Sequence, residues 1–219
     1  MGITINLRGT GGAGKTEFVR RILGDYGWKR HEPGPVEAIR QRGRRRPIAY
    51  RAPHPAEGRP LLVPGHYEAT CGGCDTITVR DGGLEAVFRL AAEHAATGHD
   101  VLLEGLHLSA DHELTAAYAA RHPLHVVWLD TPAEACVRHL LARRRSGRAA
   151  EAATAAKIAA EREAIARACE RLSAVAAVEA LGFEAALARV RGLLGLPQAP
   201  RRDPAWGKAT ESCGGFIFG

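Results

Sequence analysis

The chain has 219 residues, of which 46% are apolar and 25% charged. This length allows one domain of generous size with a substantial core, and the composition excludes a wholly disordered chain. Thirty basic residues against twenty-four acidic ones give a formal net charge of +6. Only four of the basic residues are lysines, and arginine favours forked contacts with phosphate, although an Ala-, Gly- and Arg-rich composition is also typical of a GC-rich genome.

The composition also bears on the compartment. No stretch approaches the roughly eighteen apolar residues of a membrane span, and residues 1–8 lack the layout of a signal peptide. We therefore expect a soluble, cytosolic protein with no membrane partner. Five cysteines, an odd number, favour free thiols over a disulfide framework.

Predicted strands and helices alternate along the chain. Short alternating or wholly apolar runs predict strands at residues 1–7, 48–51, 61–63, 101–103, 124–129 and 175–181. Apolar residues at helical spacing predict helices at residues 14–23, 84–95, 109 or 111–121, 133–145, 149–172 and 184–194. Strands alternating with helices indicate a mostly parallel sheet that is covered on both faces.

Local signals mark several helix ends. Gly24 stands at the expected C-terminal cap of the first helix, and residues 131–134 form a capping box with proline at the first helical position. The segments 48–51 and 61–63 suit a hairpin. We expect one domain over residues 1–195, with a basic insertion at about 26–64 and a lid at about 138–150, followed by a tail at 196–219 whose Phe216–Phe218 run is unusual for an exposed end.

A glycine-rich segment between the first predicted strand and helix matches the pattern G-x-x-x-x-G-K-[ST] in full. In this motif, backbone N–H groups surround nucleotide phosphates, and side chains beyond Cβ would block them. Lys15 would neutralise β- and γ-phosphate charge, and the Thr16 hydroxyl would bind Mg²⁺. The alternative is a structural turn without a ligand. The expected nucleotide-binding residues are Gly9, Thr10, Gly11, Gly12, Ala13, Gly14, Lys15, Thr16 and, further along, Arg138.

Glu104 directly follows the apolar strand at residues 101–103. We expect it to be the second metal ligand, beside Thr16, for Mg²⁺ bound together with ATP or GTP as the phosphoryl donor. Acidic residues at strand ends are common, so this assignment depends on the glycine-rich segment at residues 9–16.

An arginine cluster occupies the end of the helix predicted from residue 133 and the turn behind it. Its members are Arg138, Arg143, Arg144, Arg145 and Arg148. Such a cluster can close as a lid over a transferring phosphoryl group, with Arg143 and Arg144 stabilising its charge. The alternative is a solvated basic helix end that complements the helix dipole.

These features together resemble the P-loop kinases of the nucleoside and nucleotide kinase group. The resemblance is carried by residues 9–16, by Val-Leu-Leu-Glu-Gly at 101–105, and by Trp-Leu-Asp-Thr-Pro at 128–132 before the arginine cluster. It covers about residues 1–195. It implies a three-layer α/β fold of the P-loop NTPase type, with a mostly parallel five-stranded sheet, and phosphoryl transfer to an acceptor. An N-K-x-D run, the guanine-specificity signal of GTPases, is absent, which disfavours a switch protein.

Residues 65–77 resemble a motif of the bacteriophage 5-hydroxymethyluracil DNA kinases. The matching residues are Gly65, Tyr67, Cys71, Gly72, Gly73, Cys74, Asp75 and Thr76. The resemblance implies ATP- or GTP-dependent phosphorylation of the hydroxymethyl group of a base already in DNA, in a host cytoplasm. The basic insertion departs from the family in its details. Two alternatives stay open: a small-molecule nucleoside, nucleotide or metabolite kinase of the same fold, and a non-catalytic nucleotide-binding module.

Side chains of the same segment suggest how an acceptor is held. Asp75 is the candidate general base for an acceptor hydroxyl, with Glu68 as a second candidate. The alternative for Asp75 is an N-cap of the segment that follows it. His66 and Tyr67 are candidates to stack on or hydrogen-bond a base that is flipped out of the duplex or already single-stranded.

The small residues Cys71, Gly72, Gly73 and Cys74 suit close packing beside the acceptor. Cys71 and Cys74 have the spacing of half a zinc site, but no second pair of cysteines completes it.

Positive charge is concentrated between residues 29 and 51, where the local excess equals the net charge of the whole chain. Arg42, Arg44, Arg45 and Arg46 are expected to contact the DNA backbone. The alternative is a solvated flexible loop.

Overall fold

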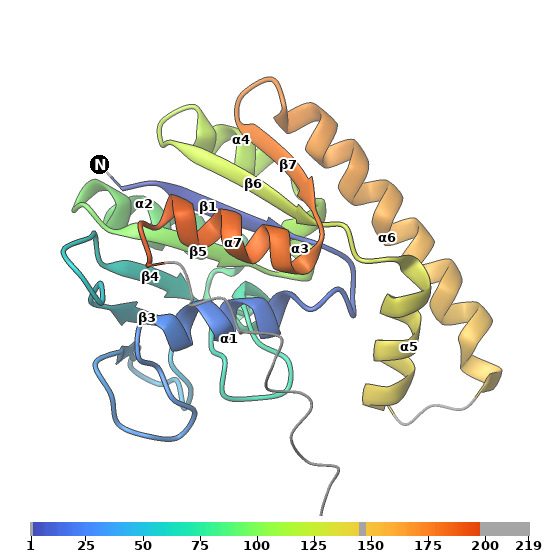
Figure 1. The fold of residues 1–219 in the computed structure, drawn as a ribbon, viewed down its shortest axis with the longest axis horizontal. Coiled ribbons are helices and arrows are strands. Elements are labelled where there is room, and N and C mark those ends of the chain that lie inside the picture. Colours follow the sequence, from blue (N-terminus) through green and yellow to red (C-terminus); the bar gives the residue numbers. More distant parts are fainter. Residues whose placement is uncertain (1, 145–147, 198–219) are drawn as a thin grey trace, which may run out of the picture.

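The computed structural model describes residues 2–144 and 148–197, and it places a central seven-stranded sheet between two layers of helices (Figure 1). The strands are β1 (Thr4–Arg8), β2 (Glu37–Ile39), β3 (Ala49–Ala52), β4 (Leu61–Pro64), β5 (Asp100–Glu104), β6 (Leu124–Leu129) and β7 (Ala177–Leu181). The helices are α1 (Lys15–Asp25), α2 (Gly83–Ala96), α3 (Leu106–Ala110), α4 (Glu113–Ala119), α5 (Ala133–Arg144), α6 (Glu151–Leu172) and α7 (Phe183–Leu193). Short 3₁₀ turns are η1 (Cys74–Thr76), η2 (Val79–Asp81) and η3 (Arg148–Ala150).

The strand order is β2-β3-β4-β5-β1-β6-β7. The five strands from β4 to β7 in this order are mutually parallel, whereas β3 pairs antiparallel with β4 and β2 pairs antiparallel with β3. The mostly parallel α/β class is confirmed, but the expected number of five strands is wrong because β2 and β3 extend one edge. The three residues of β2 are exposed or half-buried, so no apolar pattern announced this strand.

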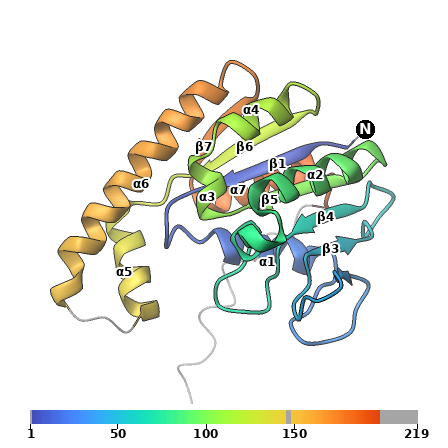
Figure 2. The ribbon, with the colours of Figure 1, turned by 180° about the vertical axis from the view of Figure 1, so that it is seen from behind.

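The two faces of the sheet pack against different helices. Ile5 and Leu7 of β1 belong to the hydrophobic cluster that includes residues of α1 and α7. Val101 and Leu103 of the neighbouring strand β5 belong to the other cluster, which includes residues of α2 and α4. Figures 1 and 2 show α1 and α7 on one side of the sheet and α2, α3 and α4 on the other. Burial on both faces explains why β5 reads as a continuous apolar run.

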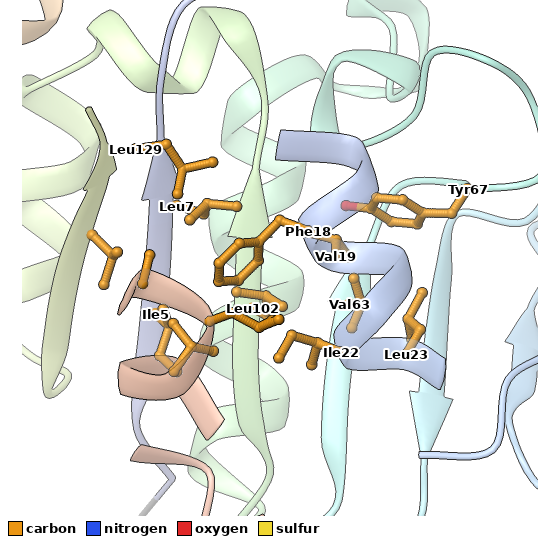
Figure 3. Packing of buried hydrophobic residues seen from close by; sticks show 14 of the residues in the cluster. Ile5, Leu7, Phe18, Val19, Ile22, Leu23, Val63, Tyr67, Leu102 and Leu129 are labelled. Atoms are coloured by element: carbon orange, nitrogen blue, oxygen red, sulfur yellow. The ribbon is translucent and has the colours of Figure 1, made fainter. Parts of the chain in front are cut away.

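Helix α1 packs its apolar side onto the sheet. Phe18, Val19, Ile22 and Leu23 are fully buried and point at residues of β1, β4 and β5 (Figure 3). Gly24, predicted as the cap, lies inside the helix, and the chain turns at Gly27 instead (φ 85°). The Trp28 N–H donates to the Leu23 carbonyl and the Gly27 N–H to the Gly24 carbonyl, both at 2.9 Å, which is the Schellman pattern.

The helix predicted from residue 109 or 111 to 121 is two short helices, α3 and α4. Asp111 has an extended backbone between them (ψ 136°), and its carboxylate accepts the N–H of Thr115 at 2.9 Å and the Thr115 hydroxyl at 2.8 Å. This local side-chain cap competes with a continuous helix, which accounts for the break.

The remaining predicted elements agree with the structure within a few residues, apart from the tail. Residues 198–219, including Phe216–Phe218, lie outside the described part of the chain. No helix within residues 2–144 and 148–197 is long and apolar enough to cross a membrane.

Parallel strands bring their carboxyl ends to one edge of the sheet. The chain leaves β1 at Gly9, β5 at Gly105 and β6 at Asp130, and these three strands are adjacent. Three segments that are distant in sequence therefore meet at one edge.

Arg8, the last residue of β1, is fully buried and joins this edge to α3 and α4. Its guanidinium donates to the carbonyls of Ser109 (2.9 Å) and Asp111 (2.7 Å) and to the Thr115 hydroxyl (3.0 Å). Burial lowers the pKa of Arg8, and the hydrogen bonds compensate for part of the desolvation.

We predict that Arg8→Met lowers the free energy of unfolding by about 2–4 kcal/mol, because the buried Ser109 carbonyl, the partly buried Asp111 carbonyl and the buried Thr115 hydroxyl lose a donor. Urea denaturation measures the change. The control is Arg189→Met, which removes only an exposed pair with Glu179 and should cost less than about 1 kcal/mol. Equal losses for the two variants would contradict the structural role of Arg8.

Candidate active site

The glycine-rich loop at residues 9–16 begins directly after β1 and ends in the first turn of α1. Gly12 (φ 79°) and Gly14 (φ 95°) have left-handed backbone conformations. A Cβ atom on Gly12 would collide with the Cys136 carbonyl, so the loop packs directly against the backbone of α5. Glycine is required at residue 12 on both grounds.

Lys15 turns back into the loop. Its side chain is buried, and Nζ donates to the carbonyls of Gly9 (2.7 Å) and Thr10 (3.0 Å). Burial lowers the pKa of Lys15, while the negative charges of Glu104 and Asp75 raise it. The ammonium group is thus held against the carbonyls at the start of the glycine-rich loop.

Glu104 lies at the end of β5 beneath the loop. Its Oε1 accepts the Thr16 hydroxyl at 3.2 Å, and the carboxylate is almost completely buried. Burial raises the pKa of Glu104 to about 7, against the opposing effect of Lys15. The free-energy cost of desolvating this carboxylate therefore exceeds the stabilisation that Lys15 and the Thr16 hydroxyl give to its charged form.

The Thr16–Glu104 pair fits the needs of Mg²⁺. This ion commonly takes one or two protein oxygens and completes its octahedron with waters and substrate phosphates. Within the described residues there is no group of three or more His, Cys, Asp or Glu side chains arranged for a metal ion. A site that shares its ligands with a bound nucleotide suits these residues better than a cage made only of protein ligands.

Asp75 is held by the start of α3. Its Oδ2 accepts the Leu106 N–H at 2.5 Å and its Oδ1 accepts the His107 N–H at 3.1 Å. The predicted alternative, an N-cap of the segment that follows Asp75, is wrong: Asp75 lies within η1, and the N–H groups that it accepts begin 31 residues further on, in α3. The side chain is exposed and lies on the same cavity wall as Lys15 and Glu104.

Glycines let residues 65–76 approach Glu104. Gly65 (φ 96°) and Gly73 (φ 91°) have left-handed backbones. A Cβ on Gly65 would collide with the Gly73 carbonyl, and one on Gly73 would collide with the Glu104 carboxylate. Close packing therefore requires glycine at residues 65 and 73, which are among the residues on which the family resemblance is based.

One cavity of about 620 Å³ joins these groups. Its walls include predicted residues from the glycine-rich loop together with Cys71, Gly72, Asp75, Glu104 and Arg143. They also include residues that were not predicted, namely Glu17, Arg20, Arg21, Thr70, Leu106, Thr131, His139 and Phe183.

Three residues predicted to meet the acceptor are turned away from the cavity. Tyr67 and His66 are 0% and 2% exposed, and the thiol of Cys74 is buried as well. The Tyr67 ring points at α1 in the core (Figure 3), and burial raises its pKa well above the usual range. His66 Nε2 lies 3.0 Å from Arg46 Nη1. The prediction that His66 and Tyr67 contact a base is wrong for this conformation, and Cys74 packs beneath the site.

Arg44 is also used internally. It forms a largely buried ion pair with Asp81 and donates to the Thr76 carbonyl at 3.1 Å. The expectation that it faces the DNA backbone is therefore wrong. Arg42, Arg45 and Arg46 are exposed on the same segment.

The lid expected at about residues 138–150 falls on the second half of α5 and on η3, with residues 145–147 outside the described part of the chain. Arg143 lines the cavity, whereas Arg138 and Arg144 are exposed and do not, and Arg145 lies outside the described residues. His139 contributes instead, with Nδ1 2.9 Å from the Gly12 carbonyl. The Thr131 hydroxyl, at the start of the predicted capping box, donates to the Ala13 carbonyl at 3.0 Å, which attaches the start of α5 to the loop.

A second carboxylate faces the loop from α6. Glu161 Oε2 accepts the Gly11 N–H at 2.8 Å. Glu161 is 150 residues away from Gly11, and no sequence pattern connects the two.

Arg20 ties the two sides of the cavity together. It lies one helical turn beyond Thr16, and its Nε donates to the Tyr67 carbonyl at 3.0 Å while Nη2 donates to the Ala69 carbonyl. The i, i+4 spacing from Thr16 on a predicted helix places Arg20 on the cavity side and would have been enough to nominate it.

A curated protein of Pseudomonas phage PaMx11, named 5-hmdU DNA kinase, is 37% identical to the chain over 142 residues. The aligned region is 64% of this chain and 68% of the phage protein. This chain belongs to the phage 5-hmdU DNA kinase family. No family model matches the chain. The resemblance stated from residues 65–76 is confirmed at the level of the family.

We predict that Glu161→Gln lowers the Kd for a nucleoside triphosphate about fivefold, or roughly 1 kcal/mol. The amide oxygen still accepts the Gly11 N–H, but the negative charge beside the expected phosphate position is gone. Calorimetric titration measures the affinity. The control is Glu163→Gln, on the same helix, whose exposed side chain pairs with Arg167. Weaker binding by Glu161→Gln would contradict the charge argument.

Proposed function

We propose that the protein is a nucleoside-triphosphate-dependent phosphotransferase of the P-loop kinase type that phosphorylates the hydroxymethyl group of 5-hydroxymethyluracil in DNA. The observation that carries the proposal is that Lys15, the Thr16–Glu104 pair and Asp75 meet in one cavity. Membership of the family, with a relative named 5-hmdU DNA kinase, supports the choice of acceptor.

The donor, ATP or GTP, would bind along residues 9–16. The backbone N–H groups of the loop and the start of α1 face the phosphates, and Lys15 exchanges its bonds to the Gly9 and Thr10 carbonyls for phosphate oxygens. Thr16 and Glu104 would hold Mg²⁺, which neutralises charge on the β- and γ-phosphates when bound.

Asp75 would act on the acceptor. Leu106 and His107 fix its carboxylate through one hydrogen bond to each oxygen, and each oxygen keeps a further acceptor position for a hydroxyl group. The hydroxymethyl oxygen forms a bond to the γ-phosphorus, the bond from that phosphorus to the β-γ bridging oxygen breaks, and the hydroxyl proton passes to Asp75.

Arg143 supplies positive charge from the lid side of the cavity. Helix α5 carries Arg143, and Arg162 of α6 fixes the start of α5 by donating to the Thr131 carbonyl at 3.0 Å and to Asp130 at 2.7 Å. An arginine at the transferring group stabilises its charge, so Arg143 is the lid residue that we assign to catalysis.

DNA would approach from the side of residues 40–46. Arg42, Arg45 and Arg46 are exposed there and suit contacts with backbone phosphates. Because Asp75 lies on the wall of a cavity, the target base has to leave the helical stack or arrive single-stranded. The expected setting is the cytoplasm of a phage-infected host.

We predict that Asp75→Asn lowers phosphate transfer to 5-hydroxymethyluracil DNA at least about a hundredfold, within the range of general-base catalysis. Transfer of label from γ-labelled ATP measures the reaction. Nucleotide affinity should stay near the wild-type value, and the melting temperature should fall modestly because asparagine can accept only one of the two N–H groups of α3. Lys15→Ala should weaken both transfer and nucleotide binding.

The matched control is Glu68→Gln, because Glu68 does not line the cavity. Full transfer by Asp75→Asn, or its loss in Glu68→Gln, would refute the assignment of the base.

We also predict that transfer to DNA weakens steeply between about 50 and 200 mM salt, because several arginines release counterions from the backbone. Transfer to a free nucleoside should be nearly insensitive to salt over this range. Labelling only of the free nucleoside, with no effect of salt, would instead support the small-molecule kinase.

A further inference from the structure

Val79 is an apolar side chain held almost entirely in solvent. It is 91% exposed, and it and Val175 are the two exposed large apolar residues in the described part of the chain. A single exposed apolar residue is common on proteins. Val79 differs from such residues in two respects, namely the hydrogen bonds that hold its turn and its closeness to Asp75 in the sequence.

The turn that carries Val79 is rigidly braced. Thr78 and Asp81 form a capping box, in which the Thr78 hydroxyl donates to Asp81 Oδ2 at 2.8 Å and the Thr78 N–H does so at 3.1 Å. Arg44 reaches across from another segment to pair with Asp81 and to donate to the Thr76 carbonyl. Thr78, directly before Val79, and Asp81, two residues after it, are therefore both held by hydrogen bonds, and Val79 is presented on a turn that is fixed at its two ends.

Val79 also lies close to the reacting groups. It lies four positions after Asp75 in the sequence, so their Cα atoms are at most about 14 Å apart. Ile77, between them, is buried in the core and anchors the connection. Cationic residues adjoin the turn in sequence or through Arg44: Arg80 follows Val79 directly, and the exposed Arg45 and Arg46 follow Arg44, which is bonded to the turn.

We propose that Val79 is a wedge that enters duplex DNA and occupies the space left by the flipped target base. The inference rests on the proposed function and adds a specificity-determining residue to it. Proteins that unstack or extrude bases commonly insert an apolar side chain at the vacated step, while arginines hold the adjacent phosphates. A β-branched side chain on a braced turn loses little conformational freedom when it inserts.

The test compares two DNA substrates with the variant Val79→Ser. The first is a duplex with 5-hydroxymethyluracil paired to adenine, and the second is the same modified strand alone. We expect kcat/KM for the duplex to fall at least about tenfold, because the variant lacks the apolar side chain that offsets unstacking, while kcat/KM for the single strand stays within about twofold. Val175→Ser, at the other exposed valine, should leave both values unchanged.

A second measurement follows base flipping without phosphate transfer. 2-Aminopurine beside the target base becomes fluorescent when the stack opens. Wild type with the duplex should raise this signal, and Val79→Ser should not, at protein concentrations that saturate binding. Melting temperatures of the two variants should match that of the wild type because both side chains are exposed.

Each outcome decides the proposal. Equal losses of kcat/KM on the two substrates would show that Val79 contributes to catalysis or folding and not to base flipping. Unchanged kcat/KM on the duplex would show that Val79 has no role in base flipping. Either result would overturn the proposed wedge. A wild type that phosphorylates only single strands would overturn the wedge and leave the proposed function standing. A wild type that phosphorylates neither DNA would refute both.

Discussion

The buried carboxylate of Glu104 is the group around which the candidate active site is built. Moving a charge out of water costs free energy, and the raised pKa of Glu104 indicates that this cost exceeds the stabilisation from its neighbours. Its neighbours come from two separate segments: Lys15 and Thr16, at the start of α1, add a positive charge and a hydroxyl donor, and Gly73 lets the acceptor segment approach without a side chain. The fold tolerates this cost at the one edge where a metal ion and phosphates would remove it.

The two sides of the cavity are organised by different forces. On the donor side, backbone packing dominates, because α5 meets Gly12 directly and Thr131 bonds to the Ala13 carbonyl. On the acceptor side, polar contacts dominate, because Asp75 depends on the N–H groups of α3, and α3 in turn is joined to β1 through Arg8. The position of Asp75 thus depends on a buried guanidinium at the end of the central strand.

The sequence predicted those parts of the site that have a local signature. The loop at residues 9–16 and Glu104 were found because a motif and a strand end define them, and parallel topology then brings them together. His66 and Tyr67 were misplaced because a short segment of irregular backbone has no periodicity from which to tell an inward from an outward side chain. Arg44 was misassigned because its partner Asp81 is 37 residues away, and Glu161 was missed because its contact with Gly11 is purely tertiary. Strand β2 likewise depends on its pairing with β3 at the sheet edge and not on its own apolar content, whereas β3 was predicted at residues 48–51.

Arg20 connects α1 to the segment that carries Tyr67 and Ala69. Thr16 and Arg20 lie one turn apart on the same rigid helix, about 6 Å along its axis, and Arg20 holds the carbonyls of Tyr67 and Ala69. Any tilt of α1 that accompanies contact with the donor therefore displaces the acceptor segment in the same direction. Under the proposed function, α1 would therefore carry a donor-side group and the carbonyl contacts of the acceptor segment on one rigid element, which would keep the two sides of the cavity at a fixed distance.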